Sequence, residues 1–445
     1  MKLTLIRPNM GSKDGKKYRD IASMEPYVLA VIAGLTPPGI EIQMFDDRVE
    51  EIDYDAPTDL VGITVEVFTA KRAYRIAKQY RARGVPVVMG GFHASLLPEE
   101  VSGHADAVVV GEAEPVWKTV LDDFRSGKLK KIYKSGFKCD LQGYQPDRSI
   151  FKNKKYVPIT LTHFSRGCPY RCTFCPDASL YKGNIRFRNA ADVVEDIARQ
   201  PRNFIFFVDN NISANRKKFK ELLRAITPLK VKWVSQADIN VAEDDELLKL
   251  MNESGCGGLV LGFETLDINN LNLMSKPQNI KSFSKYDELI AKIHDHGICI
   301  WGAFLLGYDS DTLDTFRSTL DFALEHKLFL AAFNALIPFY GTPIYTQLKK
   351  EKRLLYKKWW LDPNYRFGLP LYQPKHMAPE QLTEGCVAAI MKFTGAVNVL
   401  KRSTNFKANL RSFYNLQAFF GYNYLYRREF KQKYLVTLGY EESGE

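Results

Sequence analysis

The chain has 445 residues, 45% hydrophobic and 25% charged, a balance typical of a globular protein with more than one domain. The net charge of +11 allows nucleic acid, an anionic membrane surface, an acidic substrate or simply a basic solvated surface. Seven cysteines, four of them scattered, argue against a secreted disulfide framework, and the N-terminus has no apolar signal-peptide core. We therefore predict a cytoplasmic protein.

Residues 1–135 alternate short apolar strands with helical stretches. Strands are predicted at 2–8, 41–47, 60–67, 85–91 and 105–114, and helices at 27–39, 68–84 and 115–127. This alternation predicts an α/β domain with a doubly wound, Rossmann-like parallel sheet, whose ligands bind at the carboxyl ends of the strands. The candidate binding residues there are Thr64, Glu66, Gly90, Gly91, His93, Gly111 and Glu112.

A second strand–helix series follows a Lys-rich stretch at 136–155, which we interpret as a linker. The domain predicted at 156–348 has strands at 158–163, 204–208, 231–235, 258–263, 299–304 and 331–336 and helices at 190–199, 216–226, 244–253 and 283–296. Six such units predict a partial (β/α)6 barrel, with its chemistry at the carboxyl ends of the strands. The uncharged stretch 328–348 contains Pro338 and Pro343, which favour a buried strand and loop over a membrane span. Residues 349–445 are predicted to form a helical C-terminal domain that is aromatic and basic.

Three cysteines lie close together after the first predicted barrel strand. The sequence "RGCPYRCTFC" places Cys168, Cys172 and Cys175 in a C-x3-C-x2-C pattern. A structural zinc ion takes four protein ligands, and either Cys256 or a histidine could supply the fourth ligand. A 4Fe–4S cluster is usually held by four thiolates, so three would leave one iron open to a small chelating ligand.

This cysteine pattern, with Phe174 before the last cysteine, resembles the signature of the radical SAM enzymes. The resemblance implies a 4Fe–4S cluster on the three cysteines, S-adenosylmethionine (SAM) on the open iron, a 5′-deoxyadenosyl radical and a reducing partner such as flavodoxin or ferredoxin. It also implies SAM contacts from Phe174, Asp209, Gln236 and Glu264. For each of these three polar residues the alternative is a loop cap or a salt bridge at the barrel rim. Asn210 stands where many relatives have a second acidic residue.

The N-terminal domain resembles the cobalamin-binding domain found before such barrels, through "VPVVMGGFHASLLPEE" and "ADAVVVGEAEPVW". The D-x-H-x-x-G motif, whose histidine ligates cobalt, is missing, because the segment after the second strand reads "DDRVEEID". The resemblance then implies either cobalamin without a protein imidazole ligand or a domain that has lost the cofactor. His93 is a candidate to approach the corrin, and the alternative makes it a turn residue.

The combined resemblance implies a cobalamin-dependent radical SAM C-methyltransferase. Its expected substrate is an unactivated carbon of a small or apolar molecule (lipid, pigment or natural product), methylated through the 5′-deoxyadenosyl radical and methylcobalamin. The alternatives are a rearrangement or cyclisation enzyme, an RNA- or peptide-modifying enzyme, and a non-catalytic cofactor-binding protein. Nucleic acid is disfavoured because the extra cysteines and β domain of RNA-modifying relatives are absent from the sequence. The aromatic, basic C-terminus predicts either peripheral membrane contact or ordinary packing onto the barrel.

Overall fold

The computed structural model describes residues 1–440, which form two compact units. The first unit comprises Met1–Val157, Lys358–Phe367 and residues 432–440, and the second comprises Pro158–Lys357 and Gly368–Lys431. The stretch predicted as a linker at 136–155 therefore belongs to the first unit. The region predicted as one C-terminal domain at 349–445 is divided between the two units as far as the structure describes it. Within residues 1–440, no helix combines the length and apolar character needed to cross a bilayer.

The first unit is built on a six-stranded parallel sheet in the order β4-β1-β5-β6-β7-β8. Its central strand β5 is buried on both faces, so its sequence is continuously apolar rather than alternating. Helices pack on the sheet, with Trp117 of α5 and Leu29 of α1 in the core, and the predicted doubly wound fold is confirmed. The bounds are β1 (Lys2–Arg7), β4 (Glu41–Asp46), β5 (Leu60–Thr64), β6 (Val87–Gly90), β7 (Ala107–Gly111), β8 (Ile132–Gly136), α1 (Tyr27–Leu35), α2 (Ala70–Ala82), α3 (Phe92–Leu96), α4 (Pro98–Ser102) and α5 (Trp117–Arg125).

Strand β8 was not predicted from the sequence. It pairs in parallel with β7, with Val108 opposite Ile132, and forms one edge of the sheet. Of its five residues only Tyr133 is buried, because an edge strand needs little apolar surface. A small antiparallel sheet also joins the two ends of the chain in this unit, through β2 (Gly11–Lys13), β3 (Lys16–Lys17) and β17 (Thr437–Leu438).

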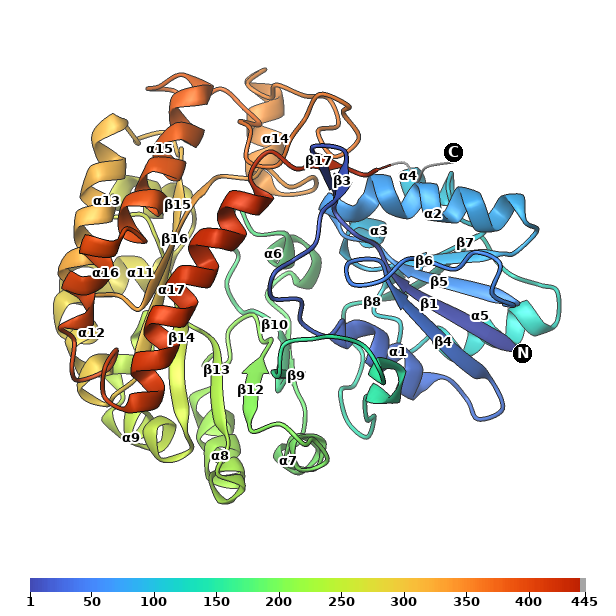
Figure 1. Ribbon diagram of the computed structural model, residues 1–445, viewed down its shortest axis with the longest axis horizontal. Helices are drawn as coiled ribbons and strands as arrows, with labels where there is room; N and C mark the ends of the chain where they lie inside the picture. The colour runs from blue at the N-terminus through green and yellow to red at the C-terminus, as the bar shows by residue number, and fades with distance from the viewer. Residues whose placement is uncertain (441–445) are drawn as a thin grey trace. The chain divides into compact units, whose positions relative to one another are not determined.

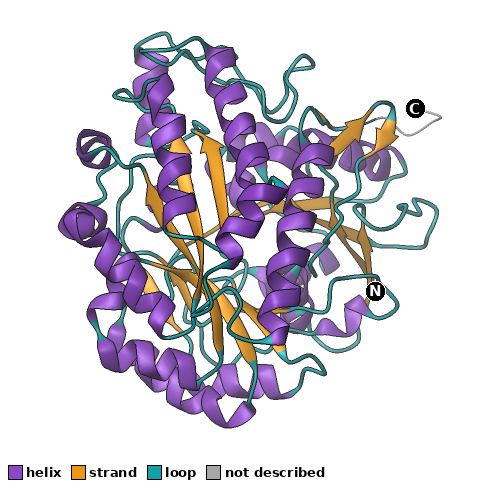
Figure 2. Ribbon diagram, turned by 60° about the vertical axis from the view of Figure 1, so that its left-hand side comes forward, coloured by secondary structure: helices purple, strands orange, loops and turns teal. Residues whose placement is uncertain are grey.

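The second unit is a partial barrel of six parallel strands in the order β16-β15-β14-β13-β12-β9. The six predicted strands are confirmed to within two residues at each end. Strands β9 and β16 are edges that do not pair with each other, so the sheet stays open; Figures 1 and 2 show the helices around it. The bounds are β9 (Thr160–Thr162), β12 (Phe204–Phe207), β13 (Lys232–Ala237), β14 (Cys256–Glu264), β15 (Cys299–Leu306) and β16 (Leu330–Ala335).

Burial along the strands shows which face of this sheet is open. In β14, Leu259, Leu261 and Phe263 are buried, whereas the alternating residues Val260 and Glu264 are partly exposed. Because side chains alternate across a strand, one face lies under the helices and the other lines the inside of the partial barrel. The helices are α6 (Pro176–Tyr181), α7 (Ala190–Ala198), α8 (Arg216–Ile226), α9 (Asp245–Glu253), α10 (Ile268–Leu273), α11 (Pro277–Ser282), α12 (Tyr286–Asp295), α13 (Leu313–Glu325), α14 (Pro343–Lys350), α15 (Pro379–Phe393), α16 (Ala396–Ser403) and α17 (Phe413–Lys433).

The C-terminal helices of the second unit are held by a buried arginine. Arg402 of α16 donates hydrogen bonds to the carbonyls of Leu328 and Phe393 and to the amide oxygen of Asn423 in α17. Its guanidinium also lies 3.6 Å from the centre of the Phe393 ring. Burial lowers the pKa of Arg402 to about 9. These contacts fix α15, α16 and α17 beside the amino end of β16.

Candidate active site

The three clustered cysteines lie on one loop at the carboxyl end of the barrel strands. The loop leaves a short hairpin of β10 (Ser165–Gly167) and β11 (Ile185–Phe187), and it ends where Cys175 precedes helix α6. Thr173, in the middle of the loop, donates its backbone N–H to Met274 O at 3.0 Å and its hydroxyl to Leu273 O at 3.0 Å. Its own carbonyl accepts the N–H of Ile344 at 3.1 Å. The loop is thereby tied to two other turns of the second unit.

Asp209, predicted as a SAM contact, instead anchors the base of the loop. Its carboxylate is fully buried and accepts hydrogen bonds from the backbone N–H of Phe164 and from the N–H and hydroxyl of Ser165. Burial raises the pKa of Asp209 to about 6, against the opposing effect of these hydrogen bonds. With both oxygens used inside the fold, Asp209 is a positioning residue. Asn210 supports the same loop, because its amide oxygen accepts the N–H of Gly167 and its nitrogen donates to Asp177.

The three thiols are close enough to influence one another. Burial, assisted by its neighbours Cys172 and Asp177, raises the pKa of Cys168 to about 11, and burial with Asp177 and Cys172 raises that of Cys175 to about 12. Among residues 1–440, no three Cys, His, Asp or Glu side chains converge on the position of a single metal ion. Thiolates around one zinc lie about 3.8 Å apart, whereas a cubane cluster binds each thiolate through a different iron and accepts a wider spacing.

The position of the remaining cysteines of the second unit leaves the fourth site of such a cluster open. Cys256 and Cys299 are buried at the amino ends of β14 and β15, at the opposite end of these strands from the loop. Cys386 is buried in α15. Zinc with Cys256 as fourth ligand is not compatible with these positions, and neither Cys256, Cys299 nor Cys386 lies on the loop to complete a four-thiolate cluster. The donor set fits a 4Fe–4S cluster with one iron free for a non-protein ligand.

A buried ion pair at the end of β14 lies next to the loop. Glu264 has a left-handed backbone with φ of 64°, a strained geometry for a non-glycine residue, and its carboxylate pairs with the Lys276 ammonium. Lys276 also donates to the carbonyl of Gly262 at 2.7 Å and acts electrostatically on the Cys172 thiol. Sequence analysis predicted Glu264 as a site residue but missed Lys276. Lys276 lies twelve residues later, beyond helix α10, and is not part of a recognisable motif.

The other predicted SAM contacts have accessible positions. Gln236 is exposed on β13, on the same alternating set as Val234, and Phe174 is half-buried on the loop. A cavity of about 1000 Å³ opens beside the loop and includes Cys172 in its wall. Three cationic side chains that the sequence analysis missed also line this cavity, namely Arg171, Lys182 and Lys350. An anionic group on a bound molecule would be stabilised there.

In the first unit, the strand order reverses between β1 and β5, which is where ligands of open α/β sheets bind. Thr64 and Glu66 lie at the carboxyl end of β5, and Gly90 and Gly91 follow on β6. The Glu66 carboxylate is 53% exposed and pairs with Arg7 at 3.0 Å, which lowers its pKa. Gly91 has φ of +106°, and a Cβ there would lie 2.9 Å from Val65 O. The backbone therefore forms a tight cradle at Gly91, in which any residue with a side chain would clash.

Two residues predicted to line this site point into the protein instead. His93 is 2% exposed, and its Nε2 lies 3.1 Å from both Tyr74 Oη and Glu100 Oε1, so its ring is engaged inside the protein and its approach to a corrin stays a prediction. Glu112 is 6% exposed and accepts the N–H of Cys139. Its neighbour Gly111 is closed off by β8, because a Cβ there would meet Gly136 O at 2.4 Å.

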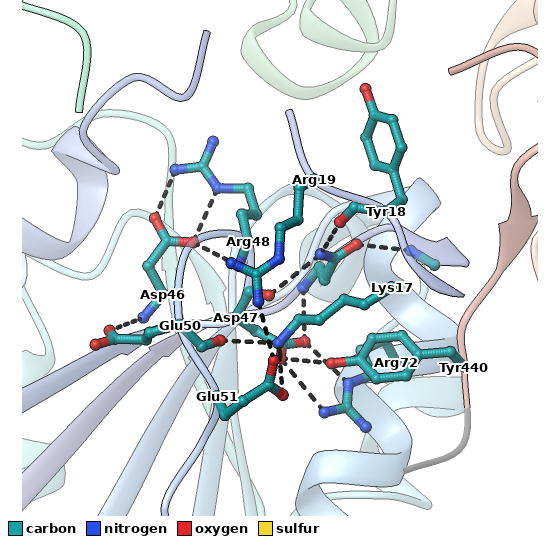
Figure 3. A network of polar contacts seen from close by, with 12 residues as sticks. Lys17, Tyr18, Arg19, Asp46, Asp47, Arg48, Glu50, Glu51, Arg72 and Tyr440 are labelled. Carbon is teal, nitrogen blue, oxygen red and sulfur yellow. Dashed lines mark hydrogen bonds and ion pairs between the residues drawn. The ribbon is translucent and has the colours of Figure 1, made fainter. Parts of the chain in front are cut away.

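The segment "DDRVEEID" supplies a saturated polar network rather than a metal ligand (Figure 3). Asp47 is fully buried and accepts from Arg72 Nε at 2.9 Å and Tyr440 Oη at 2.7 Å, and Lys17 Nζ lies 2.9 Å away. Asp46 is held by Arg48 in the same way. The carboxyl end of β4 is thus occupied by the protein's own side chains. The carboxyl ends of β1, β5 and β6 are left as the place where a ligand could bind.

The cradle at Gly91 gives a testable expectation. Gly91→Ala should lower the free energy of unfolding of the first unit by about 3 kcal/mol, because the new Cβ meets backbone atoms that cannot move aside. The matched control is Gly84→Ala, where φ is also positive but no atom lies within 4 Å, so only about 1 kcal/mol should be lost. Denaturant titration compares the two variants. Equal losses would show that the close approach to Val65 has no energetic weight.

Comparisons with known proteins show the family of this chain. The sequence profile of the radical SAM superfamily matches residues 162–323. The chain is 30% identical to the bacteriochlorophyllide d C-12(1)-methyltransferase of Chlorobaculum tepidum over 85% of this chain and 84% of that protein. It is 26% identical to the hopanoid C-2 methylase of Rhodopseudomonas palustris, over 76% of this chain and 67% of that one. The chain belongs to the radical SAM superfamily and is an enzyme of that class.

A solved structure shares the fold of both units. The radical S-adenosylmethionine methyltransferase TsrM of Kitasatospora setae, solved with cobalamin and a 4Fe–4S cluster bound, superposes with a TM-score of 0.69. The match covers 97% of this chain and 99% of that chain at 16% sequence identity. It therefore confirms the predicted combination of a Rossmann-like unit, a partial barrel and C-terminal helices.

Proposed function

We propose that this protein is a cobalamin-dependent radical SAM C-methyltransferase that acts on an unactivated carbon of an apolar pigment or lipid-like molecule. The observation that carries the proposal is the 30% identity to a bacteriochlorophyllide methyltransferase over 85% of this chain and 84% of that protein. The similarity to a hopanoid methylase is a second, separate observation that supports an apolar, lipid-like substrate. The three cysteines on one loop add further support, because they would leave one iron of a 4Fe–4S cluster without a protein ligand.

In this proposal the residues of the second unit hold the SAM-cleaving group. Cys168, Cys172 and Cys175 bind the 4Fe–4S cluster, which supplies the electron that splits the sulfonium of SAM. Asp209 and Thr173 keep the loop in place, so the three thiols are presented together. Gln236 offers an amide on the inner face of the sheet, suited to the ribose hydroxyls of SAM. Glu264 Oε1 is engaged by Lys276, so its other carboxylate oxygen would be the one left for the ammonium of SAM.

The first unit holds cobalamin at the carboxyl edge of β5 and β6 in this proposal. The corrin cobalt supplies the methyl group that is passed to the substrate carbon. Thr64, Glu66, Gly90 and Gly91 would contact it, since Gly91 brings the backbone close to whatever lies at this edge. His93 is engaged with Tyr74 and Glu100 and is not a candidate for the cobalt ligand.

The proposal includes a reducing cytoplasmic setting and an electron-donor protein such as flavodoxin or ferredoxin. Cys168, Cys172, Cys175, Cys256, Cys299 and Cys386 are thiols in the part of the chain that the structure describes, which supports a reducing compartment. The donor requirement follows from the need for one electron for each SAM that is cleaved.

The test is an anaerobic assay of SAM cleavage with dithionite, in protein reconstituted with and without hydroxocobalamin. The proposal expects stoichiometric corrin uptake in the visible spectrum, 5′-deoxyadenosine formation, and transfer of labelled methyl from SAM to a chlorin or a polycyclic lipid. SAM cleavage with corrin uptake but without methyl transfer to any substrate would support a rearrangement or cyclisation instead. Failure to bind corrin would overturn the methyltransferase assignment while leaving radical SAM membership intact.

A further inference from the structure

The surface formed by α16, the following loop and the first half of α17 concentrates exposed apolar side chains. Of the seventeen large hydrophobic side chains exposed among residues 1–440, nine lie between residues 397 and 424. Single exposed apolar residues are ordinary, but a cluster of this kind marks a binding surface. We define the apolar face by six residues of this cluster, namely Val397, Leu400, Phe406, Phe413, Phe420 and Tyr424, which are 38% to 74% exposed.

Helix α17 is apolar on two sides, and only one of them is covered by the protein. Phe419 and Asn423 are buried, with the Phe419 ring 5.5 Å from that of Phe329 and Asn423 Nδ2 donating to Phe329 O. Phe413, Phe420 and Tyr424 lie at positions i, i+7 and i+11 on the exposed side. The apolar side of a helix normally packs against a partner. The exposed side of α17 is therefore expected to have a partner.

The charge of this segment indicates the nature of that partner. From residue 385 to residue 428 the sequence contains seven lysines and arginines and no aspartate or glutamate. Arg402 is buried, and Arg427 donates to Met391 O, but Lys392, Lys401 and Arg428 are exposed. Asp295 of α12 reaches the segment and is paired there with Lys407. The complementary surface is anionic.

We propose that the apolar face docks the enzyme on an anionic lipid bilayer. Aromatic rings and aliphatic side chains flanked by lysine and arginine suit the headgroup boundary of such a membrane. Four of the six residues carry rings on which a base could also stack, so nucleic acid is an outcome of the test below, whereas Val397 and Leu400 add aliphatic surface that suits the acyl boundary of a bilayer. The face lies beside the amino ends of β15 and β16, where Asn415 approaches Cys299 and Asn423 approaches Phe329. Docking there leaves the cysteine loop, at the carboxyl ends, accessible. The inference goes beyond the proposed function and does not depend on it.

The primary experiment is vesicle flotation of the full chain. The protein should float with vesicles of phosphatidylglycerol and phosphatidylcholine, bind about tenfold less to phosphatidylcholine alone, and be released by salt, because surface charge attraction is screened. Equal binding to both kinds of vesicle, or to neither, would overturn the proposal.

Two sets of variants separate the apolar and the electrostatic contributions. The apolar variant Leu400→Gln/Phe413→Gln/Tyr424→Gln should reduce the partition coefficient about tenfold or more, because apolar area is withdrawn from the interface. The charge variant should weaken binding to anionic vesicles and abolish its dependence on salt; it combines Lys392→Gln, Lys401→Gln and Arg428→Gln. The matched controls change exposed residues elsewhere and should bind like the unchanged chain. They are Val28→Gln/Leu313→Gln/Leu355→Gln, at side chains 46% to 52% exposed, and Lys128→Gln/Lys217→Gln/Lys349→Gln.

Other occupants of the face give distinct results. If the apolar variant abolishes a concentration-dependent dimer in analytical ultracentrifugation and leaves vesicle binding unchanged, the face is an interface between copies of the chain and the proposal fails. A salt-sensitive gel shift with RNA that the charge variant removes, without vesicle binding, would overturn it in favour of nucleic acid. Because flotation measures binding alone, its outcome is independent of SAM cleavage and methyl transfer.

Discussion

Replacing Cys168, Cys172 and Cys175 together by alanine is expected to abolish the visible absorption of the reconstituted cluster and to reduce dithionite-dependent SAM cleavage to background. The three thiols of one short loop are the expected donor set, because Cys256 and Cys299 lie at the other end of their strands and Cys386 is buried in α15. Absorption, iron content and 5′-deoxyadenosine formation measure the result.

The matched control removes three other thiols from the same unit. Cys256→Ala/Cys299→Ala/Cys386→Ala takes away buried side chains and should lower stability, but the cluster and SAM cleavage should remain. Cluster absorption that persists in the loop variant, or disappears in the control, would contradict the assignment of the cluster to the loop.

Much of the fold was predictable because its signals are local. The strands of the second unit are runs of apolar residues, and polar N-caps mark where helices begin, such as Asn215, which accepts the N–H of Lys218 at the start of α8. The alternation of strands and helices then leaves few topologies, since parallel strands need a crossover helix. The cysteine loop was predictable for the same reason, because its three donors lie within eight residues.

The parts that sequence analysis missed depend on contacts between distant segments. Tyr440 donates to Asp47 across 393 positions, and it is this network, with Arg72, that occupies the end of β4. His93 follows a glycine turn, as a ligand-binding residue would, but a glutamate seven positions later and Tyr74 of α2 turn it inward. No periodicity or motif records such pairings, so a residue at a strand end can be recognised from sequence while the direction of its side chain cannot.

The buried pair of Glu264 and Lys276 gives the second large expectation. Lys276→Met should lower the free energy of unfolding of the second unit by about 3 kcal/mol, because removing one partner leaves the other charge buried and uncompensated. The Glu264 side chain is only 14% exposed, so water cannot replace the ammonium. Denaturant titration of the second unit's transition measures the loss, with Lys281→Met as the exposed control.

The double variant Glu264→Gln/Lys276→Met tests the cause of that loss. If the uncompensated carboxylate is responsible, neutralising it should restore part of the stability, and the double-mutant cycle should give a coupling of about 2 kcal/mol. Additive losses would mean that Lys276 acts through its hydrogen bond to Gly262 rather than through the ion pair, and the strained turn at Glu264 would then be held by that bond alone.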